Sequence, residues 1–265
     1  MEAKIAHASG WQYAAVSAGK FRRLHKARWW QHFQDPYTLW LNIRDIFRLM
    51  KGLIQALGIL RHFQPDVVFI KGGYVGLPVG LAAAILRVPY LVHESDLSPG
   101  LTNRILARWA RSVAVGFPAE KYRGWYSEKL VYTGNPIRSD VAGAHRLEGL
   151  AHFKLSDKLP VIAVTGGSLG AASINDAVIE ALPELLPNYQ VIHISGERDI
   201  ERVKFEFRRL NTQYPERYKV FAFLGEGMGR VLAAADLVIS RAGANTLAEL
   251  ALLAKPAIVI PNNAM

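Results

Sequence analysis

Short apolar runs alternate with helix-like patterns along most of the chain. In the first half these runs lie at 66–70, 89–93, 112–117 and 129–136. A mixed polar stretch at 139–159 interrupts the alternation, which then resumes with runs at 160–168, 189–196, 218–225, 235–243 and 255–262. Continuous apolar strands separated by helices are typical of parallel sheets covered on both faces. The pattern predicts two doubly wound α/β domains, at 1–145 and 146–265, joined within 140–155.

The composition narrows the range of partners without naming one. The chain has 265 residues, no cysteine and a formal net charge of +10, so a disulfide framework and thiolate metal sites are excluded. The positive charge predicts an anionic partner, and nucleic acid, acidic lipid headgroups and nucleotide phosphates all satisfy it. Arginine and lysine interrupt every apolar run before it reaches the roughly 20 residues that a membrane-spanning helix needs.

Two glycine-containing loops of the second half follow predicted strands and lead into helices. The loop TGGSLGA at 165–171 predicts a helix N-terminus that presents backbone N–H groups to an anion, although a tight turn explains the glycines equally well. In SRAGANTLAEL at 240–250, a helix is predicted to start near Asn245 or Thr246, with Glu249 about one turn inside it. A helix N-terminus for a diphosphate and a carboxylate for a ribose would hold a nucleotide. The alternative makes Glu249 a solvated acid near a helix start.

Two loops of the first half also follow predicted strands. KGGYVGLP at 71–78 and HESDLSPGLTN at 93–103 each lead into a helix. His93 beside Glu94 is a candidate pair for a general base or for acceptor binding, and a structural role for the histidine is the alternative. No spacing typical of a metal-binding motif occurs, so no metal ligands are predicted.

The segment at 19–52 mixes basic residues with aromatic ones. This composition suits a membrane interface, where aromatic rings lie at the level of the headgroups and cations meet acidic lipids. Stacking of RNA bases and burial of the rings in the core are the alternatives. The candidate membrane residues are Arg22, Arg23, Trp29, Trp30, Phe33 and Trp40.

Five motifs, in order along the chain, resemble those of the MurG family of bacterial glycosyltransferases: KGGYVGLPVGLAAAI, HESDLSPGLTN, TGNPIR, GGSLGA and SRAGANTLAEL. The resemblance covers essentially the whole chain. It implies the GT-B fold, with two Rossmann-like domains whose parallel sheets face a cleft. It also implies that the second domain binds UDP-N-acetylglucosamine, with Glu249 at the ribose and Leu224 at the uracil. The full implied donor set is Arg138, Ser168, Leu224, Ala244, Asn245, Thr246, Leu247, Ala248 and Glu249.

The same resemblance implies that the first domain binds the lipid acceptor, undecaprenyl-pyrophosphoryl-N-acetylmuramyl-peptide. The reaction is then an inverting transfer of N-acetylglucosamine to the 4-hydroxyl of the muramyl sugar in peptidoglycan synthesis, with no cofactor and no metal. The implied location is the cytoplasmic face of the bacterial cell membrane, against acidic lipids of the inner leaflet, and no nucleic acid is expected to bind. Many members have asparagine at the position of Asp96. The implied acceptor residues are Tyr74, His93, Glu94, Asp96 and Asn103.

Both ends of the chain depart from the family pattern. The family opens with a strand and a GGTGGH loop, whose histidine is a leading candidate for the catalytic base, and it closes with further donor-binding residues and helices. On this basis the chain is expected to be a fragment that is poorly stable and weakly active or inactive, and its catalytic base is not assigned. The alternative functions are another GT-B lipid glycosyltransferase, a UDP-N-acetylglucosamine 2-epimerase, and a non-catalytic fragment that binds nucleotide or lipid.

Overall fold

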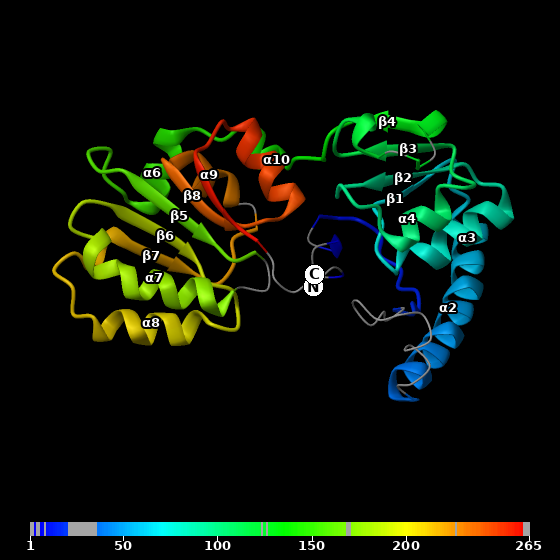
Figure 1. The fold of residues 1–265 in the computed structure, drawn as a ribbon, viewed down its shortest axis with the longest axis horizontal. Coiled ribbons are helices and arrows are strands. Elements are labelled where there is room, and N and C mark those ends of the chain that lie inside the picture. Colours follow the sequence, from blue (N-terminus) through cyan, green and yellow to red (C-terminus); the bar gives the residue numbers. More distant parts are fainter. Residues whose placement is uncertain are drawn as a thin grey trace. The chain divides into compact units, whose positions relative to one another are not determined.

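A computed structural model of the protein divides the chain into two compact units, Met1–Gly134 and Asn135–Met265. It describes residues 3, 6–7, 9–20, 36–122, 124–125, 127–167, 171–225 and 227–261 (Figure 1). Several predicted site residues therefore lie outside the described residues. They are Arg22, Arg23, Trp29, Trp30, Phe33 and Ser168.

The first unit is built on a parallel sheet with the strand order β1-β2-β3-β4. Its strands are β1 (Val68–Ile70), β2 (Tyr90–Glu94), β3 (Ser112–Val115) and β4 (Leu130–Tyr132), and each falls within or next to a predicted apolar run. Buried Val92 on β2 is in register with Ile70 on one side and Val113 on the other. Because the strands are parallel, β1 and β2 end at the same edge of the sheet, which brings the loops that follow them together.

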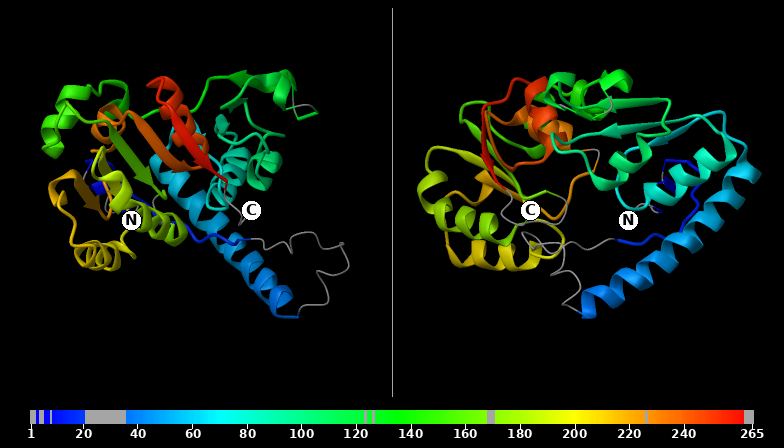
Figure 2. Two further views of the ribbon diagram at one scale, coloured as in Figure 1. Left: turned by 60° about the vertical axis from the view of Figure 1, so that its left-hand side comes forward. Right: turned by 45° about the vertical axis from the view of Figure 1, so that its right-hand side comes forward.

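Helices cover this sheet and share its core with the strands. They are α2 (Pro36–Phe63), α3 (Gly76–Leu86) and α4 (Leu101–Leu106), with short 3-10 turns η2 (Ala119–Lys121) and η3 (Ser127–Lys129). Figures 1 and 2 show α2 lying along α3. Ala56 and Leu60 of α2, Ala83 of α3 and Leu106 of α4 belong to one buried cluster with the strand residues. Hydrophobic burial therefore joins all three helices to the sheet.

Helix α2 has a second apolar face that is not buried. Its exposed positions recur at spacings of three and four residues, so they form a single stripe along the helix. Among the described residues, no helix has both the length and the apolar character required to cross a membrane. The stripe consists of Trp40, Ile43, Phe47, Met50 and Ile54.

The second unit contains a doubly wound parallel sheet with the strand order β7-β6-β5-β8-β9. Its strands are β5 (Val161–Thr165), β6 (Gln190–Ile194), β7 (Tyr218–Phe221), β8 (Leu237–Arg241) and β9 (Ala257–Ile260). The chain winds outward from β5 through β6 to β7 and then continues from β8 on the other side of β5. The predicted parallel α/β fold is confirmed, and the order reverses between β5 and β8, where ligands bind in sheets of this kind.

Helices cover both faces of the second sheet, as Figure 1 shows. On one face, α7 (Ala172–Leu185) and α8 (Ile200–Arg209) bury Ile174, Leu182 and Val203 against the strands, with the short turn η4 (Pro215–Arg217) before β7. On the other face lie α6 (Arg146–Phe153), α9 (Met228–Ala234) and α10 (Ala244–Leu252), preceded by α5 (Ser139–Ala142). All five strands of this sheet are parallel, and each face has its own apolar core.

The prediction that 140–155 joins the two domains is wrong. The division lies between Gly134 and Asn135, and 139–153 folds as α5 and α6 of the second unit. A Cβ at Gly229 of α9 would lie 2.0 Å from the carbonyl oxygen of Asp140, and one at Gly149 of α6 would lie 2.4 Å from that of Arg230. The polar composition of this stretch concealed helices that pack on α9 through glycine contacts and a few buried apolar side chains.

Candidate functional site

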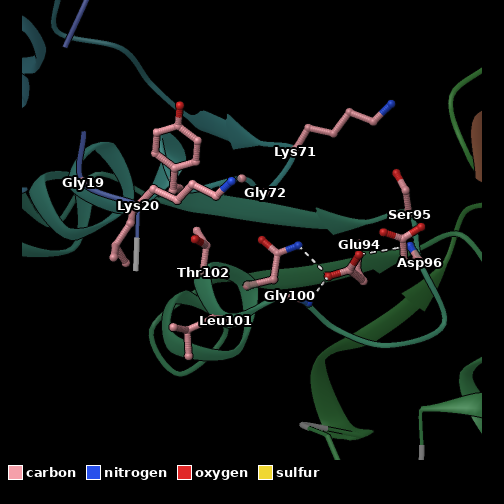
Figure 3. A pocket seen from close by; sticks show the side chains of 14 residues that line it. Gly19, Lys20, Lys71, Gly72, Glu94, Ser95, Asp96, Gly100, Leu101 and Thr102 are labelled. Carbon is pink, nitrogen blue, oxygen red and sulfur yellow. Dashed lines mark hydrogen bonds between the residues drawn. The ribbon is translucent and has the colours of Figure 1, made fainter. Parts of the chain in front are cut away.

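A hollow of about 350 Å³ lies where β1 and β2 end in the first unit (Figure 3). The loop after β1 contributes Gly72 and Gly73, which have φ values of 82° and 74°. A Cβ at Gly72 would lie 3.0 Å from Nδ2 of Asn103. Glycine is therefore needed at Gly72 both for its left-handed backbone and for the close approach of the Asn103 side chain from α4.

Glu94 organises the loop that follows β2. Its side chain is buried, and it accepts hydrogen bonds from the backbone N–H of Asp96 at 3.0 Å and that of Gly100 at 2.8 Å. Nδ2 of Asn103 donates to the same carboxylate at 2.9 Å and to the carbonyl of His93 at 3.1 Å. Figure 3 shows Glu94 at the centre of these bonds. The carboxylate thus fixes the shape of the loop around the hollow.

The hollow contains charges of both signs. Lys20 and Lys71 line it together with Glu94 and Asp96. Burial raises the pKa of Asp96, and the negative charge of Glu94 raises it further. Oδ1 of Asn103, which is buried, has no hydrogen-bond partner among the residues that the structure describes. Two ammonium groups beside carboxylates suit a ligand that carries both an anionic group and hydroxyl groups.

The structure brings four of the five predicted acceptor residues to this hollow and separates the fifth from it. Tyr74, Glu94, Asp96 and Asn103 line the hollow. His93 is 2% exposed, and its Nε2 lies 3.0 Å from the carbonyl oxygen of Gly134. A carbonyl accepts only, so Nε2 carries the proton, which leaves Nδ1 to accept from the Ser95 hydroxyl at 3.4 Å. His93 therefore connects β2 to the end of the first unit.

Two lysines of the hollow were not predicted from the sequence. Lys71 follows the last residue of β1 directly, so its place at a strand end was a usable signal. Lys20 comes from an extended segment far away in the chain, and Figure 3 shows its side chain reaching toward Gly72. Only the basic character of its surroundings indicated an anion site.

In the second unit, the start of α10 brings three predicted donor-binding positions together. Glu249 is 9% exposed, and its Oε1 accepts a hydrogen bond from Nε of Arg138 at 3.1 Å. Nη1 of Arg138 donates to the carbonyl of Gly225, the neighbour of Leu224, at 3.0 Å. The reading of Glu249 as a solvated acid is wrong, because the side chain is buried and paired.

Helix α10 begins at Ala244, after Gly243 at its N-cap, which is slightly earlier than predicted. No described side chain caps it by a hydrogen bond, so Ala244, Asn245 and Thr246 lie in the first turn, where backbone N–H groups meet an anion most readily. The N–H of Leu247 already donates to the carbonyl of Gly243 at 2.9 Å. Nδ2 of Asn135 donates to the carbonyl of Ala244 at 3.4 Å and ties this end to the start of the unit. No separate feature of the sequence selected Asn135 within TGNPIR. The donor positions in the first turns of α10 are Ala244, Asn245, Thr246, Leu247 and Ala248.

In the part of the chain that the structure describes, no group of three or more histidine, aspartate or glutamate side chains is arranged to hold a metal ion.

Comparison with known families identifies both halves of the chain. Residues 1–115 match the glycosyltransferase family 28 N-terminal domain, and residues 161–265 match the glycosyltransferase family 28 C-terminal domain. Over 261 residues the chain is 39% identical to UDP-N-acetylglucosamine-N-acetylmuramyl-(pentapeptide) pyrophosphoryl-undecaprenol N-acetylglucosamine transferase 2 of Bacillus cereus, covering 98% of this chain and 68% of that protein. The chain belongs to the MurG family. A member from Clostridium botulinum is 36% identical over the same share of each chain.

Solved structures support the fold of this MurG family member. MurG of Acinetobacter baumannii matches all of this chain and 68% of its own with a TM-score of 0.64 and 24% sequence identity. UDP-GlcNAc 2-epimerase of Neisseria meningitidis, solved with UDP-GlcNAc, matches 80% of this chain and 64% of its own with a TM-score of 0.58 and 16% identity. At these identities the likeness concerns the GT-B fold alone, and the fold does not distinguish transferase from epimerase.

Proposed function

We propose that this protein transfers N-acetylglucosamine from UDP-N-acetylglucosamine to the 4-hydroxyl of the muramyl sugar in undecaprenyl-pyrophosphoryl-N-acetylmuramyl-peptide. The observation that carries the proposal is the 39% identity, over 98% of the chain, to a relative named for this reaction. The meeting of Arg138 and Glu249 beside the start of α10 supports it, because this is the arrangement expected of a nucleotide site.

On the donor side, Glu249 accepts hydrogen bonds from the ribose hydroxyls through the carboxylate oxygen that Arg138 does not contact. Arg138 and the N-terminus of α10 bear the charge of the diphosphate. Uracil lies against the backbone near Leu224. On the acceptor side, Lys20 and Lys71 attract the diphosphate of the lipid carrier to the hollow between the two loops.

The reaction exchanges one bond at the anomeric carbon for another. The oxygen of the acceptor 4-hydroxyl attacks the anomeric carbon. The bond between the anomeric carbon and the diphosphate oxygen breaks, UDP leaves, and the configuration at the anomeric carbon is inverted. The hydroxyl proton passes to a base that is not assigned here. Arg138 and helix N-termini stabilise the negative charge that develops on the leaving diphosphate, so the departure of UDP needs no metal ion.

Incubation with UDP-N-acetylglucosamine labelled in the sugar and the lipid acceptor tests this function. We expect label in the lipid fraction, dependent on the acceptor and unaffected by a chelator of divalent ions. An excess of protein over the usual catalytic amount makes slow turnover visible. Label recovered in free UDP-N-acetylmannosamine would identify an epimerase instead, and absence of label from both products would refute the transferase assignment.

The proposal includes association with an acidic membrane surface through α2. Its apolar stripe includes Phe47, 71% exposed, and Met50, 53% exposed. Arg44, Arg48 and Lys51 lie on the same helix, against a single acid, Asp45, which is buried. Exposed apolar side chains with neighbouring cations are the composition of a helix that lies in the plane of an anionic membrane interface.

Replacing Phe47 and Met50 together by serine should weaken binding to vesicles that contain phosphatidylglycerol by at least about tenfold, because burial of each side chain contributes roughly 1.5–3 kcal/mol. Sedimentation with the vesicles measures the bound fraction. Leu147→Ser, at a 73% exposed position of α6, is the matched control and should bind as the unaltered protein does. If the double variant bound the vesicles as well as the unaltered protein does, α2 would not be the membrane contact. If the unaltered protein bound neutral vesicles as well as those with phosphatidylglycerol, acidic lipid would not be required.

A further inference from the structure

A second, larger hollow lies on the other side of the loop that follows β2. Its volume is about 880 Å³. Ser95 and Asp96 of this loop line the first hollow, whereas Leu97, Ser98 and Pro99 line the second. The two hollows therefore share the loop that follows β2, and both belong to the first unit.

The charges of the second hollow favour an anion. Its lining includes the cations Arg104 and Lys121 and one acid, Glu120, so the local formal charge is positive. Neither cation forms a salt bridge within the described ranges. Unpaired cations that share a concave surface attract a carboxylate more strongly than either would alone. The side chains that matter here are Leu97, Arg104, Glu120, Lys121, Tyr122 and Trp125.

The wall formed by Tyr122 and Trp125 is held in place. Tyr122 is 3% exposed, and its hydroxyl donates to the carbonyl of Asp96 at 3.1 Å. The rings of Tyr122 and Trp125 lie 5.9 Å apart. The Trp125 indole N–H is buried and has no acceptor among the described residues, which adds an unused donor to a residue that lines the hollow. The apolar rings and Leu97 suit small aliphatic groups next to the anion.

We propose that this second hollow, which we call the Arg104 hollow, binds the peptide of the acceptor by its terminal carboxylate. The inference rests on the proposed function. The diphosphates of the two substrates are already matched to Arg138 and to the lysines of the first hollow, and the peptide is the remaining anionic part of the acceptor. Arg104 and Lys121 pair with the carboxylate, and Leu97 and Trp125 contact the side chains of the peptide.

Calorimetric titration with soluble N-acetylmuramyl-pentapeptide tests the site without requiring turnover. We expect saturable binding that weakens as sodium chloride is added. Arg104→Ala should raise the dissociation constant about tenfold, and Lys121→Ala should raise it about threefold. The effects differ because a hydrogen-bonded ion pair, as expected for Arg104, contributes more binding free energy than a looser ion pair, as expected for Lys121. Arg108→Ala, at an exposed arginine outside the hollow, is the matched control and should leave the constant unchanged.

Two ligand variants separate this proposal from its alternatives. The pentapeptide with an amidated C-terminus should bind to the unaltered protein about tenfold more weakly than the free acid does, which equals the loss expected for the free acid with Arg104→Ala. The dissociation constant of N-acetylmuramic acid without the peptide should not change in Arg104→Ala. No binding of pentapeptide, or equal binding of acid and amide, would overturn the proposal. Failure of the transfer assay with intact pentapeptide binding would instead count against the proposed function alone.

Discussion

Lowering the pH from about 7.5 to about 5 should reduce the free energy of unfolding of the second unit by about 2 kcal/mol, because His193 is buried as a neutral imidazole. His193 lies on β6 with no exposed surface. Burial lowers its pKa from the ordinary 6.5 to about 4. This single group is expected to dominate the acid sensitivity of the unit.

The neighbours of His193 define its neutral form. Nδ2 of Asn175 donates to the carbonyl of Ser195 at 3.0 Å and to Oδ2 of Asp199 at 2.7 Å. Its Oδ1 therefore faces Nε2 of His193, at 2.9 Å, and must accept a hydrogen bond from it, so Nε2 carries the proton. Nδ1 then accepts from the hydroxyl of Tyr218 at 2.7 Å. Both ring nitrogens are satisfied without a charge, and a proton added to the ring would be buried.

The sign of the effect follows from the direction of the shift. The folded pKa of about 4 lies below the ordinary 6.5, so the unfolded chain takes up the proton first as the pH falls. Stability is complete above about pH 6.5 and is lost progressively toward pH 4, by about 3 kcal/mol in all. The hydrogen bond from Asn175 lowers the pKa of Asp199 from the ordinary 3.8, so the contribution of that carboxylate is lost only below this window.

Hydrogen exchange of peptides from β5 and β6 measures the stability of the second unit selectively. Tryptophan fluorescence does not report on this unit, because all six tryptophans lie in the first unit. His193→Gln retains a donor and an acceptor but does not titrate, so its stability should be lower at neutral pH and nearly constant down to about pH 5. His152→Gln, at an exposed position of α6, should show the pH dependence of the unaltered protein. An unchanged pH dependence in His193→Gln would show that another group is responsible.

The sequence predicted the sheets well because their strands are continuous apolar runs, most of which are buried, although β4 and β9 are largely exposed. All strands from β5 to β9 fall inside predicted runs, since continuous apolar residues leave few other structures open. The boundary between the units was missed because it is set by packing between distant segments. Val141 of α5 and Leu150 of α6 are buried in the second unit's core, although their polar neighbours indicated a linker.

The candidate sites were predictable where they follow strand ends and less so elsewhere. Tyr74 after β1 and Asp96 after β2 line one hollow because these parallel strands end at one edge. The partners of these residues were not predictable, because hydrogen bonds such as that between Arg138 and Glu249 join positions far apart in the chain. His93 and His193 show the same limit. The sequence made His93 a candidate general base with a structural role as the alternative, and the structure gives it a carbonyl partner. Nothing in the sequence selected His193, whose pKa burial lowers.

Removing the negative charge of Glu249 should weaken UDP binding by about 10–100-fold, because a hydrogen bond to a charged group contributes roughly 1.5–3 kcal/mol. Glu249→Gln keeps the size of the side chain, and its amide can still accept one hydrogen bond. Arg138 loses the Glu249 carboxylate at 3.1 Å but keeps the carbonyl of Gly225 at 3.0 Å and the carboxylate of Asp140 at 3.8 Å. Since the Arg138 side chain is 43% exposed, the free energy of unfolding should change by no more than about 1 kcal/mol.

A ribose-specific role for Glu249 makes a sharper prediction than loss of affinity. The unaltered protein should bind UDP about 10–100-fold more tightly than 2′,3′-dideoxy-UDP, and Glu249→Gln should lose most of this discrimination, because the hydroxyls and the carboxylate form one interaction. Glu201→Gln, at an exposed acid of α8, should retain it. If Glu249→Gln weakened UDP and its dideoxy analogue equally, the carboxylate would act only by holding Arg138 toward the diphosphate, and the ribose would need another partner.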